Sequence, residues 1–339
     1  MLTVDGSDGG GQILRTALSL STCFGRPVEV TNIRGARPNP GLRNQHLTVV
    51  ETLAEICDAT VSDVAVGTEE LTFDPGPPAG SHVSVDVGTA GSLTLLFDAL
   101  LPLATTLTEP LTVTATGGTD VKWAPTAAWY EQVKLPLLAR FGLDARLTVD
   151  RSGFYPVGGG EATLRLRPSE ITPLTLGTRG NLESLAVTSI ESNHLSNADV
   201  AARQATEARR LLDAAGHEVA RETVNTVESA SPGSTILVRA AYEHSLVGFD
   251  ALGEKGKPAE KVAADAVNAF RAFHQSGATV DSFLADQLLV WLALGGGEFL
   301  APRRTSHLET NRRVLDAFGY AIEVEEANDG LIRCSALSS

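Results

Sequence analysis

Hydrophobic positions follow two periods along the chain, and the order of these periods repeats. Apolar residues recur at helical spacing in 9–25, and the next segment, 27–33, alternates as a strand does. A second helical pattern fills 40–59, with a proline near its start. Two short strand-like runs follow, ATVSDVAVG and EELTFDP. This stretch therefore predicts two helices packed on a small sheet.

The same order occurs twice more. The second stretch predicts a strand, a Gly-rich helix, a strand, a helix that Pro136 must kink or split, and a hairpin, at 81–88, 88–104, 110–118, 124–142 and 144–168. The third predicts a helix at 278–297, a strand at EFLAPR, a helix from SHLETN and two final strands. We predict three repeated units, each with two helices packed on a small sheet.

One segment, 182–276, does not follow this repeated order of helices and strands. Its pattern predicts the order β-α-β-β-α and contains no Gly-rich helix opening, which favours an inserted domain over a fourth, degenerate repeat. We therefore expect an α+β protein made of α/β-type repeats. Units 1 and 2 (1–181) and unit 3 (277–339) form a large domain, and 182–276 forms a smaller inserted α/β domain.

The composition is that of a protein with an aliphatic core. At 339 residues the chain has room for roughly two to three domains, and 43% of it is apolar. It contains no apolar run long enough to span a membrane and no N-terminal signal pattern. Three distant cysteines form neither a disulfide framework nor a zinc motif. A reducing cytoplasm is the expected location.

The charge is strongly acidic, with a net value of −14 that argues against a broad basic surface for nucleic acid. The positive residues are 22 arginines and only five lysines. This balance favours adaptation to high salt, and an acidic mesophilic protein is the alternative. In molar salt the Debye length falls to ~3 Å, so charges attract a ligand only over short distances. Arginines in direct contact with a nucleic acid can still bind it.

Two loops have compositions suited to phosphate. DGSDGGGQILRT (5–16) places glycines directly before a helix, where exposed amides suit an anion, although it matches neither a Rossmann nor a P-loop fingerprint. Asp8 in this loop either caps the helix or binds a divalent cation. The loop 32–46 carries Arg34, Arg37 and Arg43, which either bind phosphate or are solvated. The glycines of FYPVGGGEA indicate a tight turn.

RTSHLETN (304–311) places His307 between arginines and a helix. Such a histidine can act as a nucleophile, a ligand or a general base, and a surface histidine is the alternative. The preceding helix contains Asp286 and Gln287 among apolar residues, after Phe283. Phe283 has either a core role or a role in base stacking. The other six histidines show no ligand spacing.

Seven motifs in one order resemble the RNA 3'-terminal phosphate cyclases: DGSDGGGQILRTALSLS, IRGARPNPGLRNQH, GTAGSLTLL, GGTD, SGFYPVGGG, LADQLL and SHLETN. The resemblance spans about residues 3 to 335. It implies three repeated units, each of two helices and four strands, with an inserted smaller domain. It also implies an ATP-dependent reaction in which a histidine accepts AMP, the AMP passes to an RNA 3'-phosphate, and the neighbouring 2'-hydroxyl closes a 2',3'-cyclic phosphate.

The resemblance also implies roles for individual residues. His307 matches the adenylated histidine, while Arg43 has no secure counterpart. Asp98, Asp286 and Gln287 match nucleotide-site positions, and Phe283 and Pro125 match the residues on the two faces of adenine. The positions implicated in phosphate or RNA-end contact are Arg15, Arg34, Arg37 and Gln45. The resemblance implies ATP as co-substrate, Mg or Mn as the divalent cation, and RNA with a 3'-phosphate as partner.

The chain departs from the family pattern at three places. Its opening loop is two residues shorter and offers Asp8 where the family has a metal-binding glutamate. Asp98 replaces a residue that is commonly glutamine. Ser152 precedes the glycine signature where histidine or arginine is usual. These differences concern the metal and nucleotide sides of the site and leave His307 in place.

Two other functions compete with cyclisation. A non-catalytic relative can act in ribosome assembly as a protein- or RNA-binding factor, but such relatives lack the nucleophilic histidine. An enolpyruvyl transferase uses similar repeated units, but it has no role for SHLETN. His307 therefore favours an enzyme. The sequence makes no prediction of the oligomeric state.

Overall fold

Three sheets of the molecule share one strand order. In the computed structural model, which describes residues 1–336, each of these sheets begins with a parallel pair of strands and ends with two antiparallel pairings. Their orders are β1-β2-β4-β3, β5-β6-β8-β7 and β9-β14-β16-β15. Each unit is thus β-α-β-α-β-β in chain order, and the α+β fold class predicted from the sequence is confirmed.

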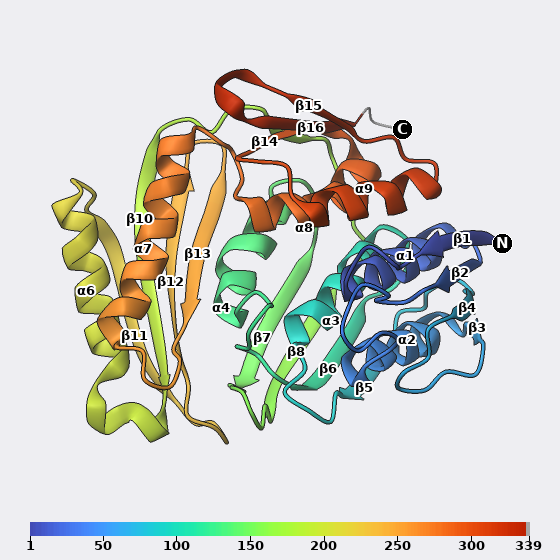
Figure 1. Ribbon diagram of the computed structural model, residues 1–339, viewed down its shortest axis with the longest axis horizontal. Coiled ribbons are helices and arrows are strands. Elements are labelled where there is room, and N and C mark those ends of the chain that lie inside the picture. Colours follow the sequence, from blue (N-terminus) through green and yellow to red (C-terminus); the bar gives the residue numbers. More distant parts are fainter. Residues whose placement is uncertain (337–339) are drawn as a thin grey trace.

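The first unit forms the N-terminal end of the molecule (Figure 1). Its elements are β1 (Leu2–Asp5), α1 (Gly11–Phe24), β2 (Val28–Thr31), α2 (Asn44–Cys57), β3 (Thr60–Val61) and β4 (Leu71–Asp74). Gly25 ends α1 in the left-handed conformation, with φ of 59°, a position that glycine adopts without steric cost. Both helices fall where the apolar spacing predicted them.

The second unit contains the interrupted helix that Pro136 predicted. Its elements are β5 (His82–Asp86), α3 (Leu93–Leu100), η1 (Leu101–Thr105), β6 (Leu111–Gly117), α4 (Ala127–Trp129), η2 (Tyr130–Lys134), α5 (Leu135–Ala139), β7 (Ala145–Arg151) and β8 (Gly160–Leu166). The middle segment, η2, is a π-helix placed directly before the turn that contains Pro136. Proline has no N–H to donate to the carbonyl of Gln132, so the α-helical ladder cannot continue through this point.

The third unit starts before the insertion. Strand β9 (Leu174–Leu176) pairs in parallel with β14 (Gly297–Ala301), although it lies within 1–181, the range predicted for units 1 and 2. The remaining elements are α8 (Ser282–Gly295), α9 (Ser306–Ala317), β15 (Glu323–Glu326), η4 (Asn328–Gly330) and β16 (Ile332–Ala336). The insertion therefore separates the first strand of unit 3 from the rest of that unit.

The inserted segment has its own sheet, ordered β11-β10-β12-β13. Its elements are β10 (Leu182–Ser192), η3 (Asn193–Ala198), α6 (Val200–Ala214), β11 (Val219–Val227), β12 (Ser234–Tyr242), β13 (Leu246–Leu252) and α7 (Ala259–Ser276). Helices α6 and α7 pack on each other and on one face of the sheet (Figure 1). The predicted order β-α-β-β-α was wrong by one strand, because β11 was missed.

The other face of the inserted sheet packs on unit 2. Trp129 donates its indole N–H to the Gly248 carbonyl at 3.0 Å, and a Cβ on Gly248 would lie 3.0 Å from the same indole ring. Arg239 Nε donates to the Gln132 carbonyl at 2.9 Å, which is the acceptor that Pro136 cannot satisfy. The helix interruption thus provides a hydrogen-bond acceptor that joins the two domains.

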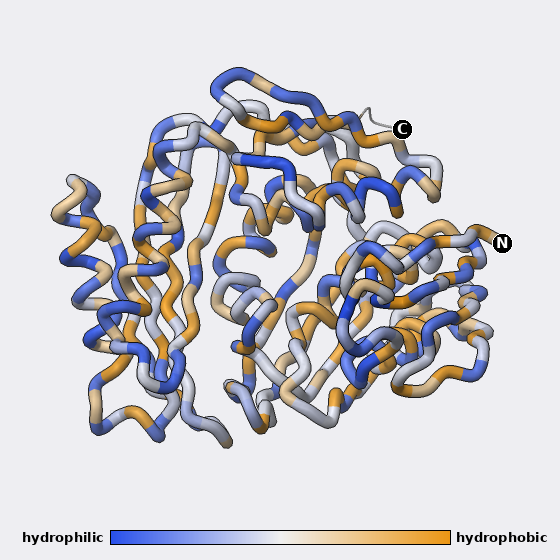
Figure 2. Tube along the Cα trace, viewed as in Figure 1, coloured by the Kyte–Doolittle hydropathy of each residue, from blue (hydrophilic) through white to orange (hydrophobic). Residues whose placement is uncertain are grey.

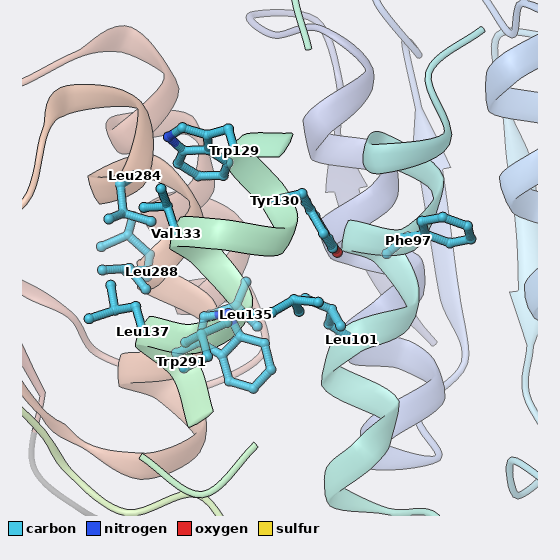
Figure 3. Close-up of a cluster of buried hydrophobic side chains, with 14 of the residues drawn as sticks. Phe97, Leu101, Trp129, Tyr130, Val133, Leu135, Leu137, Leu284, Leu288 and Trp291 are labelled. Carbon is cyan, nitrogen blue, oxygen red and sulfur yellow. The ribbon is translucent and has the colours of Figure 1, made fainter. Parts of the chain in front are cut away.

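Apolar side chains meet where units 2 and 3 join. Figure 3 shows Val133 and Leu137 of the split helix facing Leu284 and Leu288 of α8, in one cluster of buried residues. Polar segments lie on the outside of the molecule, including the start of α9 (Figure 2). Within residues 1–336, none of the helices has the length and apolar character needed to cross a bilayer.

Candidate active site

His307 occupies the first turn of α9 and is accessible to solvent. Thr305 precedes the helix and accepts the Leu308 N–H through its hydroxyl at 2.9 Å, which defines the N-terminus. The His307 side chain is 49% exposed, and its Nδ1 lies 3.6 Å from Oδ2 of Asp286 on α8. The carboxylate therefore faces Nδ1, and Nε2 is the ring nitrogen left for a ligand.

Asp286 is itself held by α9. Its Oδ1 accepts the Thr305 hydroxyl at 2.6 Å, and its backbone carbonyl accepts the Asn311 side-chain amide at 2.9 Å. The residue is buried, so these contacts compensate for the lost hydration of its polar atoms. The two predicted residues, His307 and Asp286, are therefore brought together by the packing of α8 on α9.

The start of α1 lies against the start of α9. Gln12 donates to the His307 carbonyl at 3.2 Å and to the Thr310 hydroxyl at 2.6 Å. Thr16, one turn later, donates to the Asn311 side-chain carbonyl at 3.2 Å. The Gly-rich loop predicted from the sequence is thus next to the histidine, although about three hundred residues separate them in the chain.

The N-terminus of α1 has no side-chain cap. Gly10 occupies the N-cap position without a side chain, so the first amides of the helix are left for another acceptor. A Cβ on Gly10 would lie 3.1 Å from Arg37 Nη2, and one on Gly11 would collide with the His46 ring and lie 3.1 Å from Arg15 Nη1. The absence of side chains here allows two arginines and a histidine to surround an open helix N-terminus, an arrangement that suits an anion.

Arg15, Arg34 and Arg43 gather around His46, a histidine for which the sequence predicts no role. Burial, followed by the positive charges of Arg15, Arg34 and Arg43, lowers the pKa of His46 to about 3. The ring is therefore neutral near pH 7, and its Nδ1 accepts the Arg43 backbone N–H at 3.1 Å. Arg43, which had no counterpart in the resemblance, belongs to the same positive cluster. In the sequence His46 shows no metal-ligand spacing to another histidine, so no motif identifies it.

Arg34 and Gln45 also bind parts of the protein. Arg34 Nη1 donates to the carbonyls of Asn39 and Gly41, at 2.8 and 2.9 Å, and so stabilises its own loop. Gln45 Oε1 accepts the Ser92 N–H at 3.3 Å, which links α2 to the start of α3. The structure therefore gives each a positioning contact within the arginine-lined region.

Asp98 and Gln287 meet at a buried lysine that the sequence did not single out. Lys134 Nζ lies 2.6 Å from Asp98 Oδ1 and 2.6 Å from Gln287 Oε1. Burial lowers the pKa of Lys134, and Asp98 counteracts that shift. Burial also lowers the pKa of Arg15, and Asp98 opposes this shift too. The two residues predicted for nucleotide contact thus compensate a buried cation.

Asp8 lies at the outer side of the site. Its carboxylate pairs with Arg313 of α9 at 2.9 Å, and its side chain is 65% exposed. Within residues 1–336, no group of three or more acidic, histidine or cysteine side chains is arranged to hold a metal ion. A cation at Asp8 would therefore compete with Arg313 and take its other ligands from phosphate oxygens and water.

Phe283 and Pro125 lie at the joint between units 2 and 3. Phe283 is 76% exposed in the first turn of α8, and Asp281 caps that turn by accepting the Phe283 and Leu284 N–H groups. Pro125 precedes α4, and its carbonyl accepts the Thr94 hydroxyl at 2.8 Å. Figure 3 places Leu284 in the same apolar cluster as Trp129 of α4, so the starts of the two helices are neighbours.

The fold and site together define a class of protein. Three β-α-β-α-β-β units place an exposed histidine beside an uncapped, arginine-lined helix N-terminus, which suits a phosphorylated ligand. The chain belongs to the RNA 3'-terminal phosphate cyclase family, whose family model matches residues 7–324.

Curated relatives extend over nearly the whole chain. An RNA 3'-terminal phosphate cyclase of Halobacterium salinarum is 46% identical and aligns with 99% of this chain and 100% of its own. Proteins of the same name from Methanosarcina mazei and Pyrococcus furiosus are each 40% identical, covering 94% and 96% of this chain and 95% of their own. An enolpyruvyl transferase structure from Streptomyces tendae overlaps 50% of this chain and 33% of its own at 15% identity and a TM-score of 0.29, too loosely to support that function.

Proposed function

We propose that this protein is an ATP-dependent RNA 3'-terminal phosphate cyclase that works through a covalent His307–AMP intermediate. The observation that supports the proposal most directly is the exposed His307, whose Nδ1 faces Asp286 while the open N-terminus of α1 lies beside it. Family membership supports the cyclase activity, since the relatives carry that name. The non-catalytic alternative would not need this arrangement.

In the first step, His307 Nε2 attacks the α-phosphate of ATP. A P–N bond forms, the bond to the β-phosphate oxygen breaks, and pyrophosphate leaves. Asp286 stabilises the imidazolium character that develops on the ring, because its carboxylate faces Nδ1. Arg15, Arg37 and the first amides of α1 bind the phosphate oxygens, where negative charge is concentrated.

In the second step, an oxygen of the RNA 3'-phosphate attacks the His307-bound AMP. The P–N bond breaks, the histidine becomes free, and the RNA end carries AMP through a diphosphate link. In the third step the neighbouring 2'-hydroxyl attacks the 3'-phosphorus and AMP leaves with the bridging oxygen. The proton of the hydroxyl passes to solvent or base, and a 2',3'-cyclic phosphate remains.

Phe283 and Pro125 hold the adenine in this proposal. The exposed ring of Phe283 offers one stacking face, and Pro125 at the neighbouring helix start offers the other. Asp98 and Gln287 act through Lys134, whose buried charge lies next to Arg15. Gln45 and Arg34 keep the arginine loop in position.

A divalent cation, Mg or Mn, would be held by Asp8 together with phosphate oxygens. When bound, such an ion neutralises charge on the pyrophosphate leaving group. The carboxylate of Asp8 currently pairs with Arg313, so metal binding requires that this pair opens. Asp8→Ala should weaken the metal dependence of adenylation, and an unchanged metal requirement would exclude Asp8 as a ligand.

The test is self-adenylation with α-labelled ATP and Mg or Mn, in molar KCl because of the acidic composition. We expect an acid-labile protein–AMP adduct in the native protein and none in His307→Ala. His194→Ala, a histidine in the inserted domain, is the matched control and should label normally. RNA with a 3'-phosphate should then acquire a phosphatase-resistant end. A His307→Ala protein that labels like the native one would rule out the mechanism.

A further inference from the structure

The loop between β6 and α4 exposes the side chain of Trp123. This residue is 95% exposed and adopts the left-handed region with φ of 64°, which is costly for a bulky side chain. By contrast, Trp129 and Trp291 are 4% and 2% exposed. An indole fully in water on a strained backbone needs an explanation beyond packing.

Hydrogen bonds fix the loop on both sides of Trp123. On one side, Thr119 N–H donates to the Gly153 carbonyl at 2.9 Å. On the other, Thr126 N–H donates to the half-buried carboxylate of Asp250, also at 2.9 Å. The indole is therefore presented on a braced backbone, which reduces the entropy lost when a ligand stacks on it.

A second exposed aromatic residue lies on the adjoining loop. Asp120 and Phe154 form a β-bridge, and Tyr155, the next residue, is 73% exposed. Trp123 comes three residues after Asp120 in the chain, so both aromatic side chains belong to one pair of neighbouring loops. Successive exposed aromatic rings are the usual platform for bases of a single-stranded nucleic acid.

The positive charge near Trp123 is unusual for this chain. Four of the five lysines are Lys122, beside Trp123, Lys255 and Lys257 in the segment that leads from β13 into α7, and Lys261 in the first turn of α7. Lys122 pairs with Glu254 at 2.9 Å, which joins that segment to the tryptophan loop. Lys255 is exposed and forms no ion pair within residues 1–336. Lys257 and Lys261 both pair with Asp265, at 2.7 and 3.1 Å, so Lys255 is the lysine of this group whose charge is available to a ligand.

We infer that Trp123, Tyr155 and the lysines around Glu254 form a surface for the single-stranded RNA that precedes the reacting 3'-end. This inference rests on the proposed function and extends it to a part of the substrate distant from the reacting phosphate. Trp123 is two residues from Pro125, so the surface adjoins the nucleotide site. Bases stack on the aromatic rings, and the lysines contact the backbone phosphates.

The kinetic test uses two substrates that share a 3'-phosphate, a dinucleotide and a single-stranded RNA of about ten nucleotides. We expect Trp123→Ala to raise KM for the longer RNA roughly 5- to 150-fold, as expected for the loss of one base stack. KM for the dinucleotide and the rate of self-adenylation should not change. Trp123→Phe should retain most of the affinity, and Val224→Ala, which shortens an exposed apolar side chain elsewhere, should change nothing.

A binding test works even if the protein performs no cyclisation. Because the other two tryptophans are buried, a ten-nucleotide RNA ending in a 3'-hydroxyl should quench mainly the fluorescence of Trp123. Lys255→Ala should weaken this binding and reduce its salt dependence. An unchanged KM for the longer RNA in Trp123→Ala, together with no quenching in the native protein, would overturn the surface while leaving the cyclase proposal intact. A change in sedimentation of Trp123→Ala, without an effect on RNA, would instead make this surface a protein interface.

Discussion

Helices α1 and α3 occupy equivalent places in units 1 and 2, but their N-termini are capped differently. Ser92 caps α3 by accepting the Leu95 N–H at 3.2 Å, and its own N–H is bound by Gln45. Gly10 leaves α1 without a side-chain cap, beside Arg15 and Arg37. The repeat therefore provides the same helix start more than once, and the copy next to His307 is the one that remains available to a ligand.

This difference has a cost in stability. A glycine N-cap costs only a few tenths of a kcal/mol relative to a serine cap, and the clustered arginines near His46 repel one another. Both penalties disappear when an anion binds, because the amides and guanidinium groups then share its charge. The comparison predicts that changes at α1 affect activity, whereas matched changes at α3 affect stability.

The largest effect is expected from Gly11→Ala. The added Cβ would collide with the His46 ring and crowd Arg15, so the groups that bind phosphate must move. A displacement of about 1 Å in a catalytic site can reduce the rate roughly 100-fold. The rate of self-adenylation measures this effect. Thermal unfolding should change little, because alanine favours the helix.

Gly91→Ala, directly before Ser92, is the matched control. Its Cβ would meet the Val87 side chain at 2.6 Å and Thr89 Oγ1 at 3.3 Å, and would lie in ordinary van der Waals contact with Gln45 Cβ at 3.4 Å. We expect a lower melting temperature and nearly normal adenylation. If the two variants lost activity equally, the proposed distinction between the two helix starts would be wrong.

A smaller effect is expected when the caps are exchanged. Gly10→Ser supplies a hydroxyl that competes with the ligand for the first amides of α1, and should raise KM for ATP roughly twofold, the factor equivalent to a few tenths of a kcal/mol. Ser92→Ala removes the cap of α3 and should cost about 1 kcal/mol of unfolding free energy with KM unchanged. Urea unfolding and ATP titration of adenylation measure the two quantities. An unchanged KM in Gly10→Ser would show that these amides do not bind ATP.

The repeat architecture was predictable because its signals are local. Each Gly-rich opening, apolar helix and alternating strand has a period that appears in the sequence alone. Strand β11 was missed since VARETVNTV is an edge strand with few apolar residues, so it lacks the alternation that marks a half-buried strand. The short strand β9 has only three residues and was separated from its partner β14 by the insertion.

The candidate site was predictable through motifs but not through its internal contacts. His307 and Asp286 lie on different helices, and their approach depends on tertiary packing. Lys134 appears in the sequence as one polar position in an amphipathic helix, and only the fold reveals that it is buried between Asp98 and Gln287. His46 gave no signal because its partners are arginines, which do not form a ligand motif.

The third equivalent helix start, that of α8, provides the smallest and most specific test. Asp281 caps it, and burial raises the pKa of this carboxyl to about 6; one oxygen, Oδ2, is buried without a hydrogen-bond partner within residues 1–336. The folded state therefore holds the proton of the Asp281 carboxyl more tightly than the unfolded state does. The free energy of unfolding consequently falls as pH rises from about 4 to about 6 and is then constant. For one group this corresponds to roughly 1 kcal/mol between pH 5 and 8.

Asp281→Asn keeps a capping oxygen but cannot ionise, so it should reduce this loss of stability. Asp120, whose pKa burial also raises to about 6, remains in both proteins and provides a common background. Urea unfolding at pH 5 and pH 8, at constant salt, measures the difference. Native protein should lose about 1 kcal/mol more than Asp281→Asn over this range. Parallel pH dependence in the two proteins would mean that the Asp281 carboxylate is solvated well enough to ionise normally. The start of α8 would then accept a charged capping residue, whereas the start of α3 has the neutral cap Ser92.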